Sequence, residues 1–199
     1  MINIDREIVY ESHGYRFKNF TILSDDEKRM VLEWRNSADI RKWMLKTDII
    51  SYDDHCAFIN SLSSRTDKYY WLVFTPEGSP IGVFDIVNVD YENNIAETGD
   101  YAKPQRFGDG FYFLRECLFF YFNILNIENN YTEADVDNTN IHSLNTFFGI
   151  RYNGKKTTNQ NGVIKEYLTC DSFTKDIFNE RYKLTFRDYL HYLKLYGNE

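Results

Sequence analysis

The feature that most restricts the fold is a short segment, residues 104–110, in which a strand stops at a proline and a helix starts almost at once. Pro104 has no backbone N–H and cannot extend a sheet ladder. Gly108 and Gly110 lie between the strand and the helix. Unpaired N–H groups at a helix N-terminus form an anion site, which suits a pyrophosphate. The spacing leaves one alternative open, a tight turn in which two glycines only relieve backbone strain.

This loop differs from the two commonest phosphate-binding motifs. It lacks the G-K-[ST] of a P-loop, and its glycines do not follow the G-x-G-x-x-G of a dinucleotide site. The three cysteines, Cys56, Cys117 and Cys170, are scattered and form no C-x-x-C pair. We therefore expect buried, reduced thiols and no metal site.

The composition is typical of one folded domain. The 199 residues include 16 Phe and 16 Tyr but only 3 Pro, which argues against a disordered or collagen-like chain. The net charge of −7, without a long basic run, argues against a nucleic-acid partner. No apolar run reaches the roughly 18 residues of a membrane span, and the start MINIDREIVY lacks the features of a signal peptide. We expect a cytoplasmic protein without a membrane partner.

Hydrophobic periodicity predicts a single α/β domain over residues 1–199, with residues 171–199 as a C-terminal helical extension. Ser24 and Glu27 have capping-box spacing. Strands are predicted at residues 15–21, 69–74, 81–89, 96–103 and 131–136, with two more flanking a turn at 159–162. Helices are predicted after Ser24 and Ser51, and at residues 34–44, 109–125, 139–148, 173–182 and 184–195.

The loop Gln105-x-x-Gly108-x-Gly110 is similar to the Q/R-x-x-G-x-G/A signature of the GNAT superfamily of acetyltransferases, and the order of elements agrees from about Tyr15 to Thr169. The resemblance implies a mixed, mostly antiparallel sheet of about seven strands, splayed in the middle and flanked by helices. It also implies acetyl-CoA as the acyl donor, with its pyrophosphate on the loop and its pantetheine on the splayed strand. The donor-binding residues so implied are Gly99, Tyr101, Ala102, Gln105, Arg106, Phe107, Gly108, Asp109, Gly110, Phe111, Asn140, Asn145 and Phe147.

The N-terminal half resembles one GNAT branch, the N-acetyltransferases of the pseudaminic acid pathway, through LEWRN at residues 32–36, IRKWM at 40–44 and IGVFD at 81–85. That branch acetylates the 4-amino group of a UDP-linked 4-amino-4,6-dideoxy-N-acetyl-β-L-altrosamine, on the way to a flagellin glycan. The resemblance implies a nucleotide-sugar substrate, with acceptor contacts from four residues: Arg35, Trp43, Met44 and His55. The residue types leave alternatives open, since the Arg could form a surface ion pair, the Trp and Met could be core, and the His could cap a helix.

The segment at residues 136–147 resembles the family helix N-x-x-A-x-x-x-Y, whose Asn contacts CoA and whose Tyr protonates the departing thiolate. With Asn140 as that Asn, the Tyr position holds Phe147, which we expect to pack in the core. A register that starts at Asn138 places Asn145 there instead, so neither restores the Tyr. The proton then comes from water or from one of three phenols: Tyr101, Tyr112 and Tyr152.

The expected chemistry is direct attack of an amine on the thioester, because the sequence offers no Ser/His/Asp or Cys/His arrangement for a covalent intermediate. Glu97 is the expected base and Tyr101 the second catalytic residue, since both share a strand face with Gly99. Asp100 points to the opposite face and is a weaker candidate.

Two other functions stay open on the sequence alone. The chain could acetylate a protein or peptide amine, or it could be a catalytically impaired acyl-CoA-binding protein, which the missing Tyr suggests. The aromatic stretch at residues 184–196 either packs on the sheet or forms the surface of a homodimer.

Overall fold

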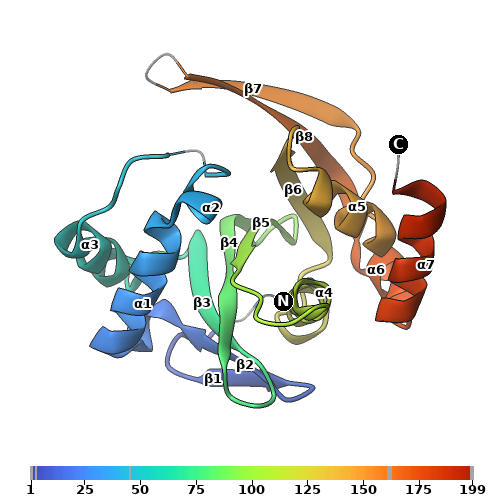
Figure 1. Ribbon diagram of the computed structural model, residues 1–199. Helices are drawn as coiled ribbons and strands as arrows, with labels where there is room; N and C mark the ends of the chain where they lie inside the picture. The colour runs from blue at the N-terminus through green and yellow to red at the C-terminus, as the bar shows by residue number, and fades with distance from the viewer. Residues whose placement is uncertain (1, 3, 45, 161–162, 198–199) are drawn as a thin grey trace.

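The computed structural model describes residues 2, 4–44, 46–160 and 163–197 (Figure 1). Within them, one sheet of eight strands has the order β1-β2-β3-β4-β5-β6-β8-β7, and only β5 and β6 are parallel neighbours. The strands are β1 (Val9–Ser12), β2 (Tyr15–Asn19), β3 (Lys68–Phe74), β4 (Pro80–Asp90), β5 (Ile95–Ala102), β6 (Asn129–Asp135), β7 (Gly154–Gln160) and β8 (Val163–Thr174). The predicted mixed, mostly antiparallel sheet is confirmed, with β1 as an additional strand. Part of the predicted turn at 159–162 lies outside the described residues.

The helices are α1 (Asp25–Asn36), α2 (Ala38–Arg41), α3 (Tyr52–Leu62), α4 (Asp109–Phe119), α5 (Thr139–Phe148), α6 (Lys175–Arg181) and α7 (Phe186–Tyr196), with a 3₁₀ turn at Phe20–Ile22 and a π-helical turn at Phe120–Ile124. The capping box of Ser24 and Glu27 is present. The helix predicted at residues 34–44 is interrupted, because Ser37 is extended and its hydroxyl donates to the carbonyl oxygen of Trp34. No described helix has the length and apolarity that crossing a bilayer requires.

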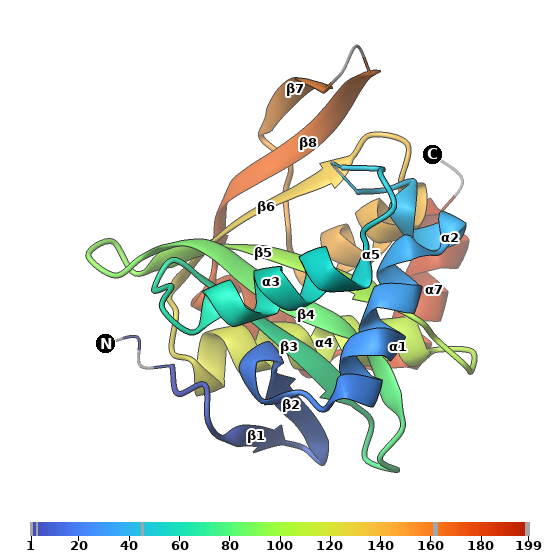
Figure 2. The same cartoon turned by 90° about the vertical axis from the view of Figure 1, so that its left-hand side faces the viewer.

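Two hydrophobic clusters hold helices on opposite faces of the sheet. Strand residues alternate between the faces, so Trp71 and Phe84 pack in the cluster with α4, while Leu72 and Val83 pack with Val31 of α1. Figures 1 and 2 show α1 and α3 on one side of the sheet and α4 on the other. The molecule is therefore a helix–sheet–helix sandwich with two distinct faces.

The sheet opens between β5 and β6. Their parallel pairing begins at Ile95 with Asn129 and ends at Thr98 with Thr132. Beyond that point β5 follows β4 and β6 follows β8, and Figure 2 shows β6 rising away from β5. At residues 99–102 the edge of β5 that faces β6 therefore has no strand beside it among the described residues, while the other edge stays paired with β4. This confirms the predicted splay.

A buried tyrosine holds the closed end of this opening. Tyr121, in the π-helical turn after α4, is fully buried. Its hydroxyl accepts a hydrogen bond from the Ala96 N–H at 3.1 Å and donates to the carbonyl oxygen of Asn129 at 2.6 Å. One side chain thus joins β5, β6 and the end of α4.

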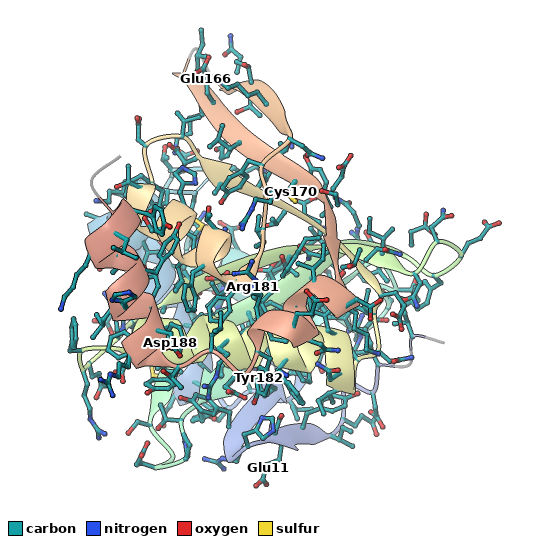
Figure 3. The ribbon with its side chains drawn as sticks, turned by 90° about the vertical axis from the view of Figure 1, so that its right-hand side faces the viewer. Glu11, Glu166, Cys170, Arg181, Tyr182 and Asp188 are labelled. Atoms are coloured by element: carbon teal, nitrogen blue, oxygen red, sulfur yellow. The ribbon has the colours of Figure 1, made fainter. Side chains whose placement is uncertain are left out.

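The C-terminal helices pack on the domain through aromatic rings. Tyr182, at the end of α6, contacts Phe119 of α4. Figure 3 shows Tyr182 on the side of the molecule where α6 and α7 lie. Tyr189 of α7 contacts Phe147 of α5. Residues 171–174, predicted as part of the helical extension, belong to β8, whose pairing with β6 continues to its last residue. The homodimer stays a prediction.

We expect Tyr121→Phe to lower the free energy of unfolding by about 1–3 kcal/mol, because Ala96 and Asn129 then lose a hydrogen-bond partner where water cannot replace it. Denaturant unfolding measures this change. Tyr196→Phe is the matched control on the exposed side of α7, where we expect a change within about 0.5 kcal/mol. Equal stabilities of the two variants would contradict the role given to the Tyr121 hydroxyl.

Candidate active site

The opening between β5 and β6 contains a cavity of about 800 Å³, a size common for small-molecule sites. Segments from α1 to α3 form one wall, and β4, β5, β6 and α5 contribute the others. It brings together these residues named from the sequence: Arg35, Trp43, Met44, His55, Glu97, Gly99, Tyr101, Ala102, Gly110, Asn140 and Asn145.

The remaining donor residues named from the sequence lie elsewhere. A neighbouring cavity of about 380 Å³ is lined by four of them: Gln105, Arg106, Phe107 and Asp109. Gly108 precedes the first turn of α4 and lines neither cavity, and the same holds for Phe111 and Phe147, which are buried in the core.

The backbone N–H groups of the loop before α4 bind a carboxylate of this chain, that of Asp109. Gly108 has φ +94°, a left-handed conformation that glycine adopts without strain, and it turns the chain into the helix. The Asp109 carboxylate accepts hydrogen bonds from the backbone N–H groups of Gln105 at 2.9 Å and Arg106 at 2.7 Å. The loop N–H groups therefore converge on one anion position beside the positive end of the α4 dipole.

Three of the carboxylates that line the cavity, those of Asp85, Glu97 and Asp100 on β4 and β5, have a raised pKa. Burial raises the pKa of Asp85 to about 7, and the charges of Asp100 and Glu97 add to this. Burial also raises the pKa of Asp100 to about 6. The pKa of Glu97 is raised by burial as well, although the Asn88 amide, which donates to it at 2.8 Å, works in the opposite direction.

Sequence reasoning missed Asp85. Its signal was present, because a single carboxylate interrupts the apolar run IGVFDIV of a central strand, where an acidic residue is uncommon.

Of the three phenols considered as acids, Tyr101 lines this cavity and Tyr152 contacts a residue that lines it. Tyr101 lines it, and burial raises the pKa of its hydroxyl. Tyr152 has its pKa raised to about 12 by burial, and its hydroxyl accepts a hydrogen bond at 2.8 Å from Asn145, which lines the cavity. Tyr112 lines the smaller cavity instead and is separated from the carboxylates.

The wall from α1 to α3 contributes nitrogen groups. Arg35 donates through Nη2 to the carbonyl oxygen of Lys46 at 2.8 Å, while its Nη1 is buried and lacks a partner among the described residues. Burial lowers the pKa of Arg35 and of His55, and the His55 Nε2 also has no partner there. Both residues line the cavity.

A lysine from the far end of the sheet forms hydrogen bonds to the backbone of this wall. Lys165 of β8 donates to the carbonyl oxygens of Lys42 at 2.6 Å and Met44 at 3.1 Å, and thereby supports the segment that carries Trp43. Sequence reasoning missed Lys165, since more than a hundred residues separate it from its partners in the chain.

The side chains that could bind metal are dispersed. No cluster of three or more His, Cys, Asp or Glu suited to a metal ion occurs in the part of the chain that the structure describes. The three cysteines are free thiols. Cys117 and Cys170 are buried as expected, whereas Cys56 on α3 is only half-buried.

Comparison with known proteins identifies the family, although no protein-family model matches the chain. Two curated relatives, both named Acetyltransferase PseH and from two strains of Campylobacter jejuni, are 37% identical over 112 residues and 36% identical over 113 residues. These matches cover 56% and 57% of this chain and 69% of each relative. The chain belongs to the PseH acetyltransferase family. The predicted class, an acetyl-CoA-dependent N-acetyltransferase of the GNAT superfamily resembling those of the pseudaminic acid pathway, is confirmed.

Solved structures share the fold. The Campylobacter jejuni N-acetyltransferase PseH in complex with acetyl coenzyme A has a TM-score of 0.58 at 24% identity, over 79% of this chain and 98% of that one. The Vibrio cholerae spermidine N-acetyltransferase in complex with CoA and spermine has a TM-score of 0.73 at 17% identity, over 84% of this chain and 99% of that one. This chain thus shares its fold with a spermidine N-acetyltransferase.

We expect Phe147→Ala to lower the free energy of unfolding by about 3–5 kcal/mol, because the ring packs against Tyr189 and Tyr192 of α7. Phe147→Leu keeps most of the apolar volume and is the control that stays folded. We expect its kcat to remain within about threefold of the wild-type value, since the ring packs away from the cavity. A loss of kcat in folded Phe147→Leu with unchanged stability would contradict this packing role.

Proposed function

We propose that this protein transfers the acetyl group of acetyl-CoA to the 4-amino group of a UDP-linked 4-amino-4,6-dideoxy sugar. Membership of the PseH family supports the reaction. The observation that carries the acceptor proposal is the buried Nη1 of Arg35 at the cavity, which has no hydrogen-bond partner among the residues that the structure describes. A guanidinium recognises a diphosphate through paired hydrogen bonds, which a neutral amine acceptor would not use.

The acceptor proposal also agrees with the rest of the cavity. Trp43 and Met44 offer apolar surface for the deoxy methyl group or the uracil, and His55 offers a buried ring nitrogen. The carboxylates on β4 and β5 suit the opposite end of such a molecule, which carries an amino group. An acceptor with an anionic and a cationic end would thus find complementary charge at both.

The donor proposal uses the free edge of β5 and the loop before α4. The exposed backbone of residues 99–102 would pair with the pantetheine, and its N–H groups are suited to stabilising the oxyanion. The N–H groups of Gln105 and Arg106 would take the pyrophosphate, with Asn140 and Asn145 contacting CoA from α5.

In the proposed reaction the amine nitrogen attacks the thioester carbonyl carbon directly. The C–N bond forms, the C–S bond breaks, the amine loses a proton and the CoA thiolate gains one. Glu97 and the other cavity carboxylates are candidates for the proton acceptor, and Tyr101 or Tyr152 for the donor. A cytoplasmic location fits the free thiols of the chain.

The deciding experiment follows thiol release from acetyl-CoA with a panel of UDP- and dTDP-4-amino-4,6-dideoxy sugars and amine-bearing peptides. We expect release with a UDP sugar. Release with peptides alone would assign the protein to peptide acetylation instead. Binding of acetyl-CoA without release from any acceptor would favour a catalytically impaired acyl-CoA-binding protein.

Arg35→Ala is expected to raise the KM for the UDP sugar about tenfold or more, because the diphosphate loses a charged donor, while the KM for acetyl-CoA stays unchanged. Steady-state kinetics measures both values. Arg29→Ala, an exposed arginine on the same helix, is the matched control. An Arg35→Ala variant with a normal sugar KM would contradict the diphosphate contact.

Asp109→Asn is expected to lower the Kd for acetyl-CoA about tenfold, because the incoming pyrophosphate must displace the Asp109 carboxylate from the N–H groups of Gln105 and Arg106. Calorimetric titration measures the affinity. Asp26→Asn removes a carboxylate from the first turn of α1, away from the loop, and should leave the Kd unchanged. Weaker binding by Asp109→Asn would show that the anion position is not the pyrophosphate site.

A further inference from the structure

The Asp85 carboxylate lies over the residue at which the sheet opens. Asp85 and Gly99 face one another across β4 and β5. A Cβ on Gly99 would come within 2.8 Å of Asp85 Oδ2 and 3.0 Å of Oδ1, so only glycine leaves room for the carboxylate there. The last parallel pair joins Thr98 to β6, and Gly99 is therefore the first residue of the free edge.

Asp85 also faces the side of the sheet that we assign to the acceptor. Strand alternation places it on the face of Val83, which packs with α1 and α3, and it lines the cavity with Arg35. Asp100 pairs with Phe84, whose side chain packs on the α4 side. The two acidic residues thus belong to opposite faces of the sheet, and Asp85 is on the face that the amine approaches.

Glu97, the base expected from the sequence, is less suitably placed. It lies at the closed end of the opening, where β5 still pairs with Tyr131 of β6. Its carboxylate already accepts a hydrogen bond from the Asn88 amide. Within the described part of the chain no hydrogen bond to the Asp85 carboxylate occurs, so its lone pairs are free to accept a proton.

We propose that Asp85 is the general base of the acetyl transfer and accepts the proton that the acceptor amine loses as it attacks the thioester. The inference rests on the proposed function. The proton moves from nitrogen to the Asp85 carboxylate while the C–N bond forms, and the CoA sulfur later takes a separate proton from a phenol or water as the C–S bond breaks.

The groups around Asp85 prepare it for this role. Burial is the largest cause that raises its pKa, to about 7, and Asp100 and Glu97 of β5 raise it further, while Lys68 of β3 lowers it. The phenols of Tyr70 on β3 and Tyr101 on β5 face the Asp85 carboxylate. A base with a pKa near neutrality combines an ionised fraction with useful basicity. The ionised form increases as the pH rises through about 7, so kcat should rise and then level off.

The test compares wild type, Asp85→Asn and Glu97→Gln across about pH 5.5 to 9 with an acceptor that the wild type acetylates. We expect Asp85→Asn to lose about 100-fold or more in kcat at pH 7, to lose the inflection near pH 7, and to keep its Kd for acetyl-CoA. Glu97→Gln should keep an inflection, displaced to lower pH because a negative charge that raises the pKa of Asp85 is removed, whereas a base at position 97 would lose its inflection with this substitution. The proposal is overturned if Asp85→Asn retains kcat within about threefold, or if only Glu97→Gln loses the inflection.

Thermal unfolding separates this role from a structural one. Because folding raises the pKa of Asp85, its carboxylate costs stability progressively as the pH rises from about 4 to about 7. Asp85→Asn should therefore have an equal or higher Tm than the wild type at pH 8. A residue that only supported the fold would give a lower Tm, together with weaker acetyl-CoA binding.

A carboxyl ¹³C NMR titration of the enzyme without acceptor keeps the inference testable if the proposed acceptor is wrong. The Asp85 signal, assigned by its absence in Asp85→Asn, should titrate near neutral pH. A pKa below about 5 would overturn the inference whatever the substrate. Failure of the proposed function would instead appear as a wild-type enzyme that acetylates no UDP sugar, with the Asp85 titration unchanged.

Discussion

The parting of β5 from β6 after Thr98 is the constraint on which the rest of the site depends. A strand edge without a neighbour is costly in a folded core, because its N–H and C=O groups need partners. Here the closed end is held by the Tyr121 hydroxyl, which bonds to both strands, and the open end borders the cavity. Hydrophobic clusters pack α1 and α3 on one face of the sheet and α4 on the other.

The buried carboxylates at the opening lower the stability of the fold when they are ionised. Asp85 occupies the space over Gly99 that any side chain would fill, and the charges of Asp100 and Glu97 add to the effect of burial in raising the pKa of Asp85. An apolar residue on β4 would pack there at lower cost, as Val83 does two positions earlier. Conflict between local stability and the surrounding fold is characteristic of functional sites, where reactivity takes precedence.

Elements from distant parts of the chain complete the site around that opening. The β7–β8 hairpin extends beyond the ends of the neighbouring strands (Figure 1). Lys165 of β8 donates hydrogen bonds to the backbone on either side of Trp43. The aromatic face of α7 packs on Phe147, the residue at the usual Tyr position, so the departure from the family helix contributes a core contact. The C-terminal helix α7 of this chain thus supports α5 from outside.

The sequence by itself determined what depends on neighbouring residues: the capping box of Ser24, the strand that stops before Pro104, the glycine loop and the helix at residues 139–148. Family resemblance then indicated some of the residues that line the cavity. Tertiary structure alone decided the placement of Asp85 over Gly99, the free Nη1 of Arg35 and the closure by Lys165. Caps and turns are formed by residues adjacent in the chain, and the sequence therefore predicts them. Burial and the pairing of charges depend instead on which strands and helices meet, and no local pattern specifies that.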